Sequence, residues 1–239
     1  MTKKTKLAIF DIDGTIFRKN LAYELINELS WKGIFKKDVR KELVKYYCNW
    51  LDHKGTYEEY RQALVDLYVQ NLKGCKKEDV VRASKEVIKF FQDRTYVFAE
   101  DLIRKLKAEN YNIIAVSGSP SEIVEEYNKH LQFDAVFGSV YELDEHDVYT
   151  GDSTFEPTKG KSQVVRQYMV ENNLSLSGSY GIGDTESDAS VLEMVENPIA
   201  FNPNLNLKEI AEKNNWQIIV EKKDVIYDMS PTLKKISNK

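Results

Sequence analysis

The feature that most constrains the fold is a repeated pairing of a short apolar run with a stretch of helical periodicity. Residues 7–10 are continuously apolar and lie between Lys6 and Asp11, which favours a strand buried on both faces of a parallel sheet. Similar runs are Asn112–Val116, Ala135–Phe137, Ser179–Ile182 and Ile199–Phe201. Helical patterns cover Phe98–Glu109, Ser121–Leu131, Gly160–Asn172 and Glu186–Val195. This alternation predicts an α/β fold with a doubly wound parallel sheet.

A long segment between the first two predicted strands carries only helical periodicity. Leu21, Leu25 and Leu29 begin this pattern, which continues to about residue 93. A direct connection would be far shorter, so we predict an inserted helical domain at 20–93, a core at 1–19 and 94–223, and a loosely packed C-terminal tail at 224–239. At helical spacing, we expect most of the inserted tyrosines and Trp50 to be core residues. The alternative is that they line a substrate cavity.

The second half of the chain contains two further local signals. The turn-rich segment Tyr141–Phe155 is typical of a β-hairpin centred on residues 144–147. After Phe201, one more helical stretch precedes Trp216–Val220, which we interpret as an edge strand.

The composition is typical of a folded globular protein. Its 239 residues include 34 Lys and Arg against 38 Asp and Glu, a net charge of −4, and 42% are hydrophobic. This apolar content argues against disorder, and the charge provides no basic field for nucleic acid. No apolar run reaches membrane-spanning length, and the run after the basic N-terminus is too short for a signal peptide. Cys48 and Cys75 form no metal or disulfide motif, and we expect a cytoplasmic protein.

Polar side chains follow three of the predicted strands. Asp11 and Asp13 follow the first, Ser117 and Gly118 follow the second, and Asp184 begins an acidic segment after a later one. The carboxyl ends of parallel strands meet at one edge of a sheet, where open α/β folds place their sites. Taken singly, these features are equally typical of a turn, a helix N-cap or a first helical turn.

Together with Lys161, these segments resemble the ordered signature of the haloacid dehalogenase-like superfamily of phosphotransferases: Asp11-Ile12-Asp13-Gly14-Thr15, then Ser117, then Lys161, then Gly183-Asp184. The resemblance covers residues 6–201. The helical insertion after the first motif and the hairpin before Lys161 are similar to the phosphoserine-phosphatase branch, which has a helical cap. The resemblance therefore implies a Rossmann-like core, a cap, and a Mg²⁺-dependent phosphomonoesterase acting on a small phosphate ester.

The same resemblance implies a role for each motif residue. Asp11 would be the nucleophile that forms an aspartyl-phosphate, and Asp13 the general acid and base. An acidic second residue also argues against dehalogenase chemistry, in which no leaving oxygen needs a proton. The Asp11 carboxylate, the Asp13 carbonyl and the Asp184 carboxylate would hold Mg²⁺, a hard cation that prefers oxygen ligands.

Further motif residues would support these groups. Ser117, the Gly118 amide and Lys161 would hold the transferring phosphoryl group. Asp188 would act through contacts with the metal ligands, and Thr15 would order the motif loop.

Specificity residues depart from the phosphoserine-phosphatase pattern. Asn20 stands where that branch carries a glutamate for the substrate's ammonium, and Glu24 is a candidate replacement one helical turn later. Ser187 stands where an asparagine is usual. Arg18 has two interpretations, a contact to a negatively charged leaving group or a hinge residue.

Two other functions remain open at this stage. A phosphotransferase or mutase of the same family would share every catalytic residue. A signalling module that is phosphorylated on Asp11 is the non-enzymatic alternative, although such receivers lack the helical insertion. Both a monomer and a homodimer are compatible with the sequence.

Overall fold

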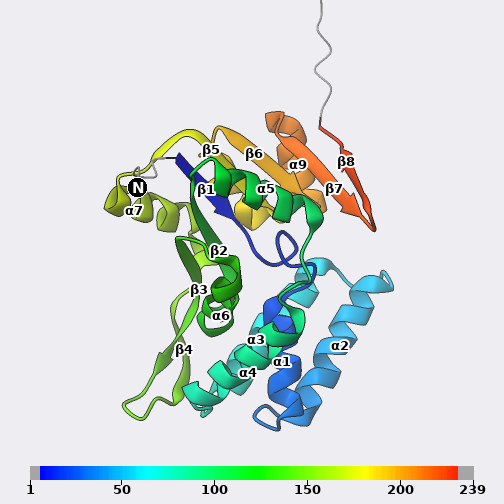
Figure 1. The fold of residues 1–239 in the computed structure, drawn as a ribbon. Helices are drawn as coiled ribbons and strands as arrows, with labels where there is room; N and C mark the ends of the chain where they lie inside the picture. The colour runs from blue at the N-terminus through cyan, green and yellow to red at the C-terminus, as the bar shows by residue number, and fades with distance from the viewer. Residues whose placement is uncertain (1–5, 231–239) are drawn as a thin grey trace, which may run out of the picture.

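The computed structural model describes residues 6–230. Their strands form one eight-stranded sheet in the order β4-β3-β2-β1-β5-β6-β7-β8 (Figure 1). The parallel strands are β1 (Lys6–Phe10), β2 (Asn112–Pro120), β3 (Ala135–Leu143), β5 (Ser175–Gly183), β6 (Asn197–Phe201) and β7 (Gln217–Lys222). The antiparallel edge strands are β4 (Tyr149–Phe155) and β8 (Val225–Asp228). The predicted α/β fold is confirmed. Because β1 lies between β2 and β5, the site expected at its carboxyl end is central.

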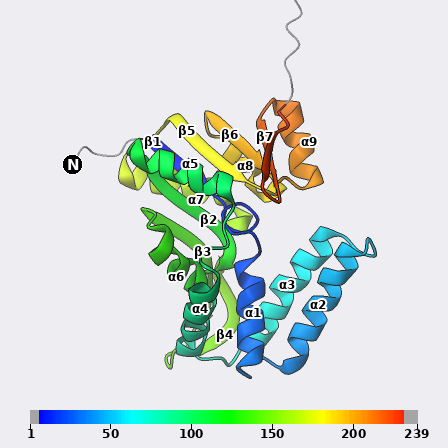
Figure 2. The same cartoon turned by 45° about the vertical axis from the view of Figure 1, so that its right-hand side comes forward.

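Helices cover both faces of the sheet (Figure 2). They are α5 (Val97–Ala108), α6 (Ser121–Leu131), α7 (Lys161–Asn172), α8 (Ala189–Leu192) and α9 (Leu205–Asn214). Alternate residues of β1 pack on opposite sides, since Phe10 shares a buried cluster with Leu106 of α5, and Ile9 shares another with Val165 of α7. Burial on both faces explains the unbroken apolar run.

Four helices lie between β1 and α5 in the chain: α1 (Leu21–Trp31), α2 (Lys37–Leu51), α3 (Tyr57–Leu72) and α4 (Lys77–Phe91). We call these helices the cap. They lie on the side of the sheet toward which β1 runs, and α4 packs beside α6 (Figures 1 and 2). One hydrophobic cluster continues from Phe10 into the cap, where it includes Leu25 and Leu64. The division into domains at 19/20 and 93/94 remains a prediction.

The two chain segments that join the cap to the core run side by side. Phe17 forms a β-bridge with Thr95. The Arg18 amide donates to the Arg94 carbonyl at 2.9 Å. These contacts form a two-stranded connection, which we call the hinge.

Two elements in the C-terminal half of the chain differ from their predictions. Residues 224–228 are not a loose tail, because Lys223 adopts a positive φ of 56° and turns the chain back into β8, which pairs with β7. Consequently β7 is not an edge strand. The helix expected over Glu186–Val195 is a short 3₁₀ turn (Glu186–Asp188) followed by α8. The rest of the predicted tail, 231–239, lies outside the described residues.

The predicted hairpin is present as β3 and β4, and Asp144 Oδ1 accepts hydrogen bonds from the amides of His146 and Val148 in its turn. Within residues 6–230, no helix combines the length and the apolar character that crossing a bilayer requires.

Candidate active site

The motif loop begins where β1 ends. The Asp11 amide still donates to the Ile182 carbonyl of β5 at 2.9 Å, so the backbone that carries Asp11 is fixed by the sheet. Gly14 adopts a φ of 84°, and a Cβ there would lie 2.2 Å from Asp184 Oδ2. A glycine is required for both reasons, since it tolerates positive φ and leaves room for the neighbouring carboxylate. The loop therefore lies directly against the end of β5.

A buried lysine joins two of the acidic motifs. Lys161 Nζ lies 2.6 Å from Asp11 Oδ1 and 2.7 Å from Asp188 Oδ1. Carboxylate oxygens of Asp11, Asp184 and Asp188 lie within 4.8 Å of one another. We call these three residues the carboxylate cluster. The structure thus brings together residues that are far apart in the sequence, as the convergence of strand ends predicts.

The charge of the cluster shifts the pKa of its members. Burial raises the pKa of Asp11 to about 8, Asp188 and Asp13 add to the shift, and Lys161 opposes it. Burial also raises the pKa of Asp184 well above its ordinary value, with help from Asp11 and Asp188. Burial by itself lowers the pKa of Lys161, but the two carboxylates outweigh it and the pKa is raised. One ammonium facing three carboxylates favours either a proton or a further cation in the cluster.

Asp13 occupies a different environment from Asp11. Its Oδ1 accepts a hydrogen bond from the Leu21 amide at 2.6 Å. Its Oδ2 accepts from the hydroxyls of Ser117 at 2.9 Å and Ser119 at 2.7 Å. Burial raises the pKa of Asp13, and these donors partly offset the rise. Two carboxyl groups two residues apart are thus held in separate settings, one beside an ammonium and one among neutral donors.

The segment after β2 differs in detail from the prediction. The Ser117 side chain is fully buried, donates to Asp13 and accepts from the Ser119 amide at 3.0 Å. Gly118 and Ser119, with Lys161, line a small cavity of about 90 Å³ next to the carboxylate cluster. Ser119 was not singled out in the sequence, although Ser117 and Ser119 lie on the same face of an extended segment. The phosphate-binding role of Ser117 remains a prediction.

Asp188, a member of the cluster, and Thr15 of the motif loop are both buried. Asp188 Oδ2 accepts from the amides of Asp184 and Thr185, each at 3.1 Å, so Asp188 fixes the backbone that carries Asp184. The Thr15 hydroxyl has no hydrogen-bond partner among the described residues. The Thr15 amide does donate to the Ile12 carbonyl within the loop at 3.3 Å, and the predicted ordering role of Thr15 remains a prediction.

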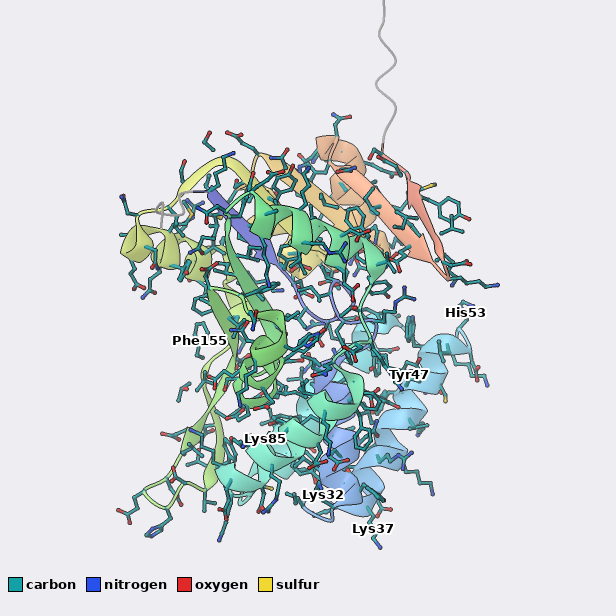
Figure 3. All side chains as sticks on the ribbon, in the orientation of Figure 1. Lys32, Lys37, Tyr47, His53, Lys85 and Phe155 are labelled. Atoms are coloured by element: carbon teal, nitrogen blue, oxygen red, sulfur yellow. The ribbon has the colours of Figure 1, made fainter. Side chains whose placement is uncertain are left out.

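A larger cavity of about 550 Å³ adjoins the small one, between the cap and the core. Aromatic side chains from the cap line it, namely Tyr23, Tyr47, Trp50, Tyr57 and Tyr60. Asp13, Asp184 and the core residue Tyr96 also line it. We call this space the aromatic cavity. Figure 3 labels Tyr47 in the half of the cap nearer the sheet, whereas Lys37 lies at the far end of the cap. These five residues pack in or against the hydrophobic core, as expected, and they also line the cavity, which is the alternative role; Tyr68 is a core residue.

The predicted specificity residues make contacts within the protein. Asn20 caps α1, because its Oδ1 accepts from the Tyr23 amide at 2.9 Å. Glu24 is buried and pairs with Lys19 at 2.8 Å. Ser187 lines the small cavity beside the cluster.

Arg18 lies in the hinge. It forms an ion pair with the buried Glu221, donates to the Thr95 carbonyl at 2.7 Å and stacks over the Tyr96 ring. Glu221, a residue that the sequence did not single out, also accepts from the Phe98 amide at the start of α5 at 2.9 Å. These contacts favour the hinge interpretation of Arg18.

Comparison with known families shows which family the chain belongs to. The family model for haloacid dehalogenase-like hydrolases matches residues 8–193. The chain belongs to the haloacid dehalogenase-like hydrolase family. The expected superfamily and hydrolase class are confirmed.

Individual relatives match almost the whole chain. A phosphoserine phosphatase from Methanocaldococcus jannaschii is 26% identical over 227 residues, covering 94% of this chain and 96% of that protein. A solved phosphoserine phosphatase with an analogue of the phospho-aspartyl intermediate is 25% identical, with a TM-score of 0.63 and coverage of 93% and 96%. A Bordetella pertussis protein of unknown function has a TM-score of 0.71 at 22% identity, covering 90% and 98%. The phosphoserine-phosphatase-like architecture therefore spans the chain.

Proposed function

We propose that the chain is a Mg²⁺-dependent phosphomonoesterase that hydrolyses a small phosphorylated metabolite through an aspartyl-phosphate on Asp11. The observation that carries this proposal is the contrast between Asp11, which pairs with Lys161 at 2.6 Å, and Asp13, which three neutral donors hold. A pair of carboxyl groups in such different settings suits a division into nucleophile and acid/base.

The residues of the cluster fit a hard divalent cation. Asp11 and Asp184 offer carboxylate oxygens within 4.8 Å of each other and of Asp188, and oxygen is the ligand that Mg²⁺ prefers. A bound cation would supply countercharge to the cluster and to an incoming phosphate. The carboxylates of Asp11 and Asp184 and the carbonyl of Asp13 would hold it, with Asp188 fixing the backbone of Asp184.

In the first step, the Asp11 carboxylate attacks phosphorus and the bond from phosphorus to the leaving oxygen breaks. Asp13 donates its proton to that oxygen, so the alcohol leaves neutral. In the second step, Asp13 takes a proton from water as the water attacks the phospho-aspartate, which releases phosphate and restores Asp11. Lys161 and the Gly118 amide stabilise charge on the phosphoryl oxygens, because both border the small cavity.

The raised pKa of Asp13 supports its part in this sequence of events. A general acid must be protonated when the leaving group departs, and burial favours the neutral carboxylic acid. The hydroxyls of Ser117 and Ser119 can rotate to donate a hydrogen bond to the Asp13 carboxylate or to accept one from the carboxylic acid, since each is both donor and acceptor.

Relatives named phosphoserine phosphatase and histidinol-phosphatase support a small phosphate ester as substrate. Phosphoserine itself is not favoured. Asn20 is engaged as a helix cap, and Glu24 pairs with Lys19. Asn20 carries an amide instead of a carboxylate, and the Glu24 carboxylate is already paired, so neither residue offers a free carboxylate for the substrate's ammonium.

Hydrolysis of p-nitrophenyl phosphate with and without Mg²⁺ tests the proposal. Asp11→Asn should abolish turnover, and Asp13→Asn should release about one equivalent of p-nitrophenol and then stop. The nitrophenolate departs without a proton, but the phospho-aspartate needs the base. Full activity of Asp11→Asn would refute the nucleophile, and phosphate appearing on a second alcohol instead of water would identify a phosphotransferase.

A further inference from the structure

The aromatic cavity is much larger than a serine-sized leaving group needs. Its volume is about 550 Å³. Cavities of 300–1,000 Å³ typically hold ligands of drug size. Because Asp13 and Asp184 form part of its wall, the cavity opens directly onto the reacting groups.

The cap side of this cavity is a packed array of rings. Trp50 and Tyr60 stack almost in parallel, with an interplanar angle of 8° and ring centroids 5.8 Å apart. Trp50 also meets Tyr57 at 5.1 Å, and Tyr47 meets Tyr60 at 5.4 Å. Each of these rings is supported by others, so they present a rigid surface that needs little ordering when a ligand binds.

The charges around the cavity disfavour an ammonium group. Two basic residues line it, Arg18 and Lys19, and they pair with Glu221 and Glu24 respectively. The acidic residues among its described lining are Asp13 and Asp184, which belong to the chemical centre. An amino or quaternary ammonium group would therefore find no carboxylate reserved for it.

We infer that the aromatic cavity receives the leaving group of the substrate, and that this group is a bulky alcohol carrying a flat, unsaturated ring system. The inference rests on the proposed phosphomonoesterase function and narrows its substrate class. Flat rings pack against Trp50 and the tyrosines in offset or edge-on geometry, which favours unsaturated rings over saturated rings of similar size. Tyrosine hydroxyls and Asn20, which lines both cavities, can hydrogen-bond ring heteroatoms.

A matched set of phosphate esters tests this inference. Ethyl, 2-cyclohexylethyl and 2-(1-naphthyl)ethyl phosphate have similar leaving-group basicity but differ in size and flatness, and phosphocholine adds a cation. We expect kcat/KM for the naphthyl ester to exceed that for the ethyl ester at least about tenfold and that for the cyclohexyl ester at least about threefold. Phosphate release is the measurement.

Two tryptophan variants localise the effect. Trp50→Leu removes a ring of the cavity, so the ratio of naphthyl to ethyl kcat/KM should fall about tenfold. Trp31→Leu is the matched control, since Trp31 belongs to the cap but is 76% exposed and is not among the residues lining the cavity. It should leave the ratio unchanged. Circular dichroism establishes that both variants are folded; if Trp50→Leu is not, Tyr57→Leu takes its place.

Binding of the corresponding phosphonates separates this inference from the proposed function. Calorimetry should give tighter binding for naphthylethyl than for ethyl phosphonate, whether or not esters are hydrolysed. Tight ring-dependent binding without hydrolysis would refute the phosphatase alone. Equal kcat/KM and equal binding across the set, or a preference for phosphocholine, would overturn the inference while the phosphatase stands.

Discussion

Replacing Lys161 by methionine should destabilise the protein strongly. Lys161 is 3% exposed, and its amine pairs with Asp11 at 2.6 Å and Asp188 at 2.7 Å. Removing one partner of a buried ion pair costs about 3–5 kcal/mol, because the remaining charges stay buried without compensation. In a chain of this length, each kcal/mol lowers Tm by about 2–4 °C, so the expected fall is roughly 6–20 °C.

The same variant should show a characteristic dependence on pH and on metal. The loss should be greatest near pH 8.5, above the pKa of about 8 for Asp11, and smaller at pH 6. Protonation of the carboxylate cluster removes the repulsion that Lys161 normally offsets. Mg²⁺ should restore part of the loss, since a divalent cation supplies the missing positive charge.

Thermal unfolding in EDTA and in Mg²⁺, followed by circular dichroism, measures these effects. Lys159→Met is the matched control. Lys159 is 75% exposed and pairs with Glu156 at 2.9 Å, and such surface pairs contribute less than about 1 kcal/mol. If Lys161→Met unfolds at the temperature of the control at pH 8.5 in EDTA, the buried-pair reasoning fails.

Three shorter predictions follow from neighbouring contacts. Gly14→Ala should cost more than about 1 kcal/mol in urea unfolding and weaken Mg²⁺ binding, because its Cβ would meet Asp184; unchanged binding would contradict this. Ser119→Ala removes a donor to Asp13 and should lower kcat about tenfold with little change in KM. The metal-free wild-type protein should lose stability as pH rises from about 4 to about 8. Because the pKa of Asp11 is raised in the folded state, the folded protein binds more protons at Asp11 than the unfolded chain does over this pH range. A stability that rises across it would refute this assignment.

The sequence predicts the carboxylate cluster well because local rules place its members. A buried strand ends where the run of apolar residues gives way to charged ones. The residues just before Asp11 and Asp184 therefore place both carboxylates at strand ends. Parallel pairing of β1 with β5 then brings the two ends together. Neither step needs knowledge of side-chain packing.

The aromatic cavity could not be predicted in the same way. Tyr47 and Trp50 on α2 and Tyr57 and Tyr60 on α3 have the helical spacing of core residues, and they do pack on one another. Whether such a face closes completely or leaves a cavity depends on how the cap meets the core. That geometry depends on contacts between distant parts of the chain, such as the packing of α4 on α6 and the ion pair of Arg18 in the hinge with Glu221.

The placement of α1 links the cap to the chemistry. The Leu21 amide, at the start of α1, donates to Asp13, and the Ala22 amide donates to Ser119, which itself donates to Asp13. A shift of this helix therefore changes both the shape of the aromatic cavity and the donors that set the proton affinity of Asp13. A cap that only recognised the leaving group would affect KM alone. Because α1 touches the proposed acid directly, a cap substitution that displaces α1 should lower kcat as well as raise KM.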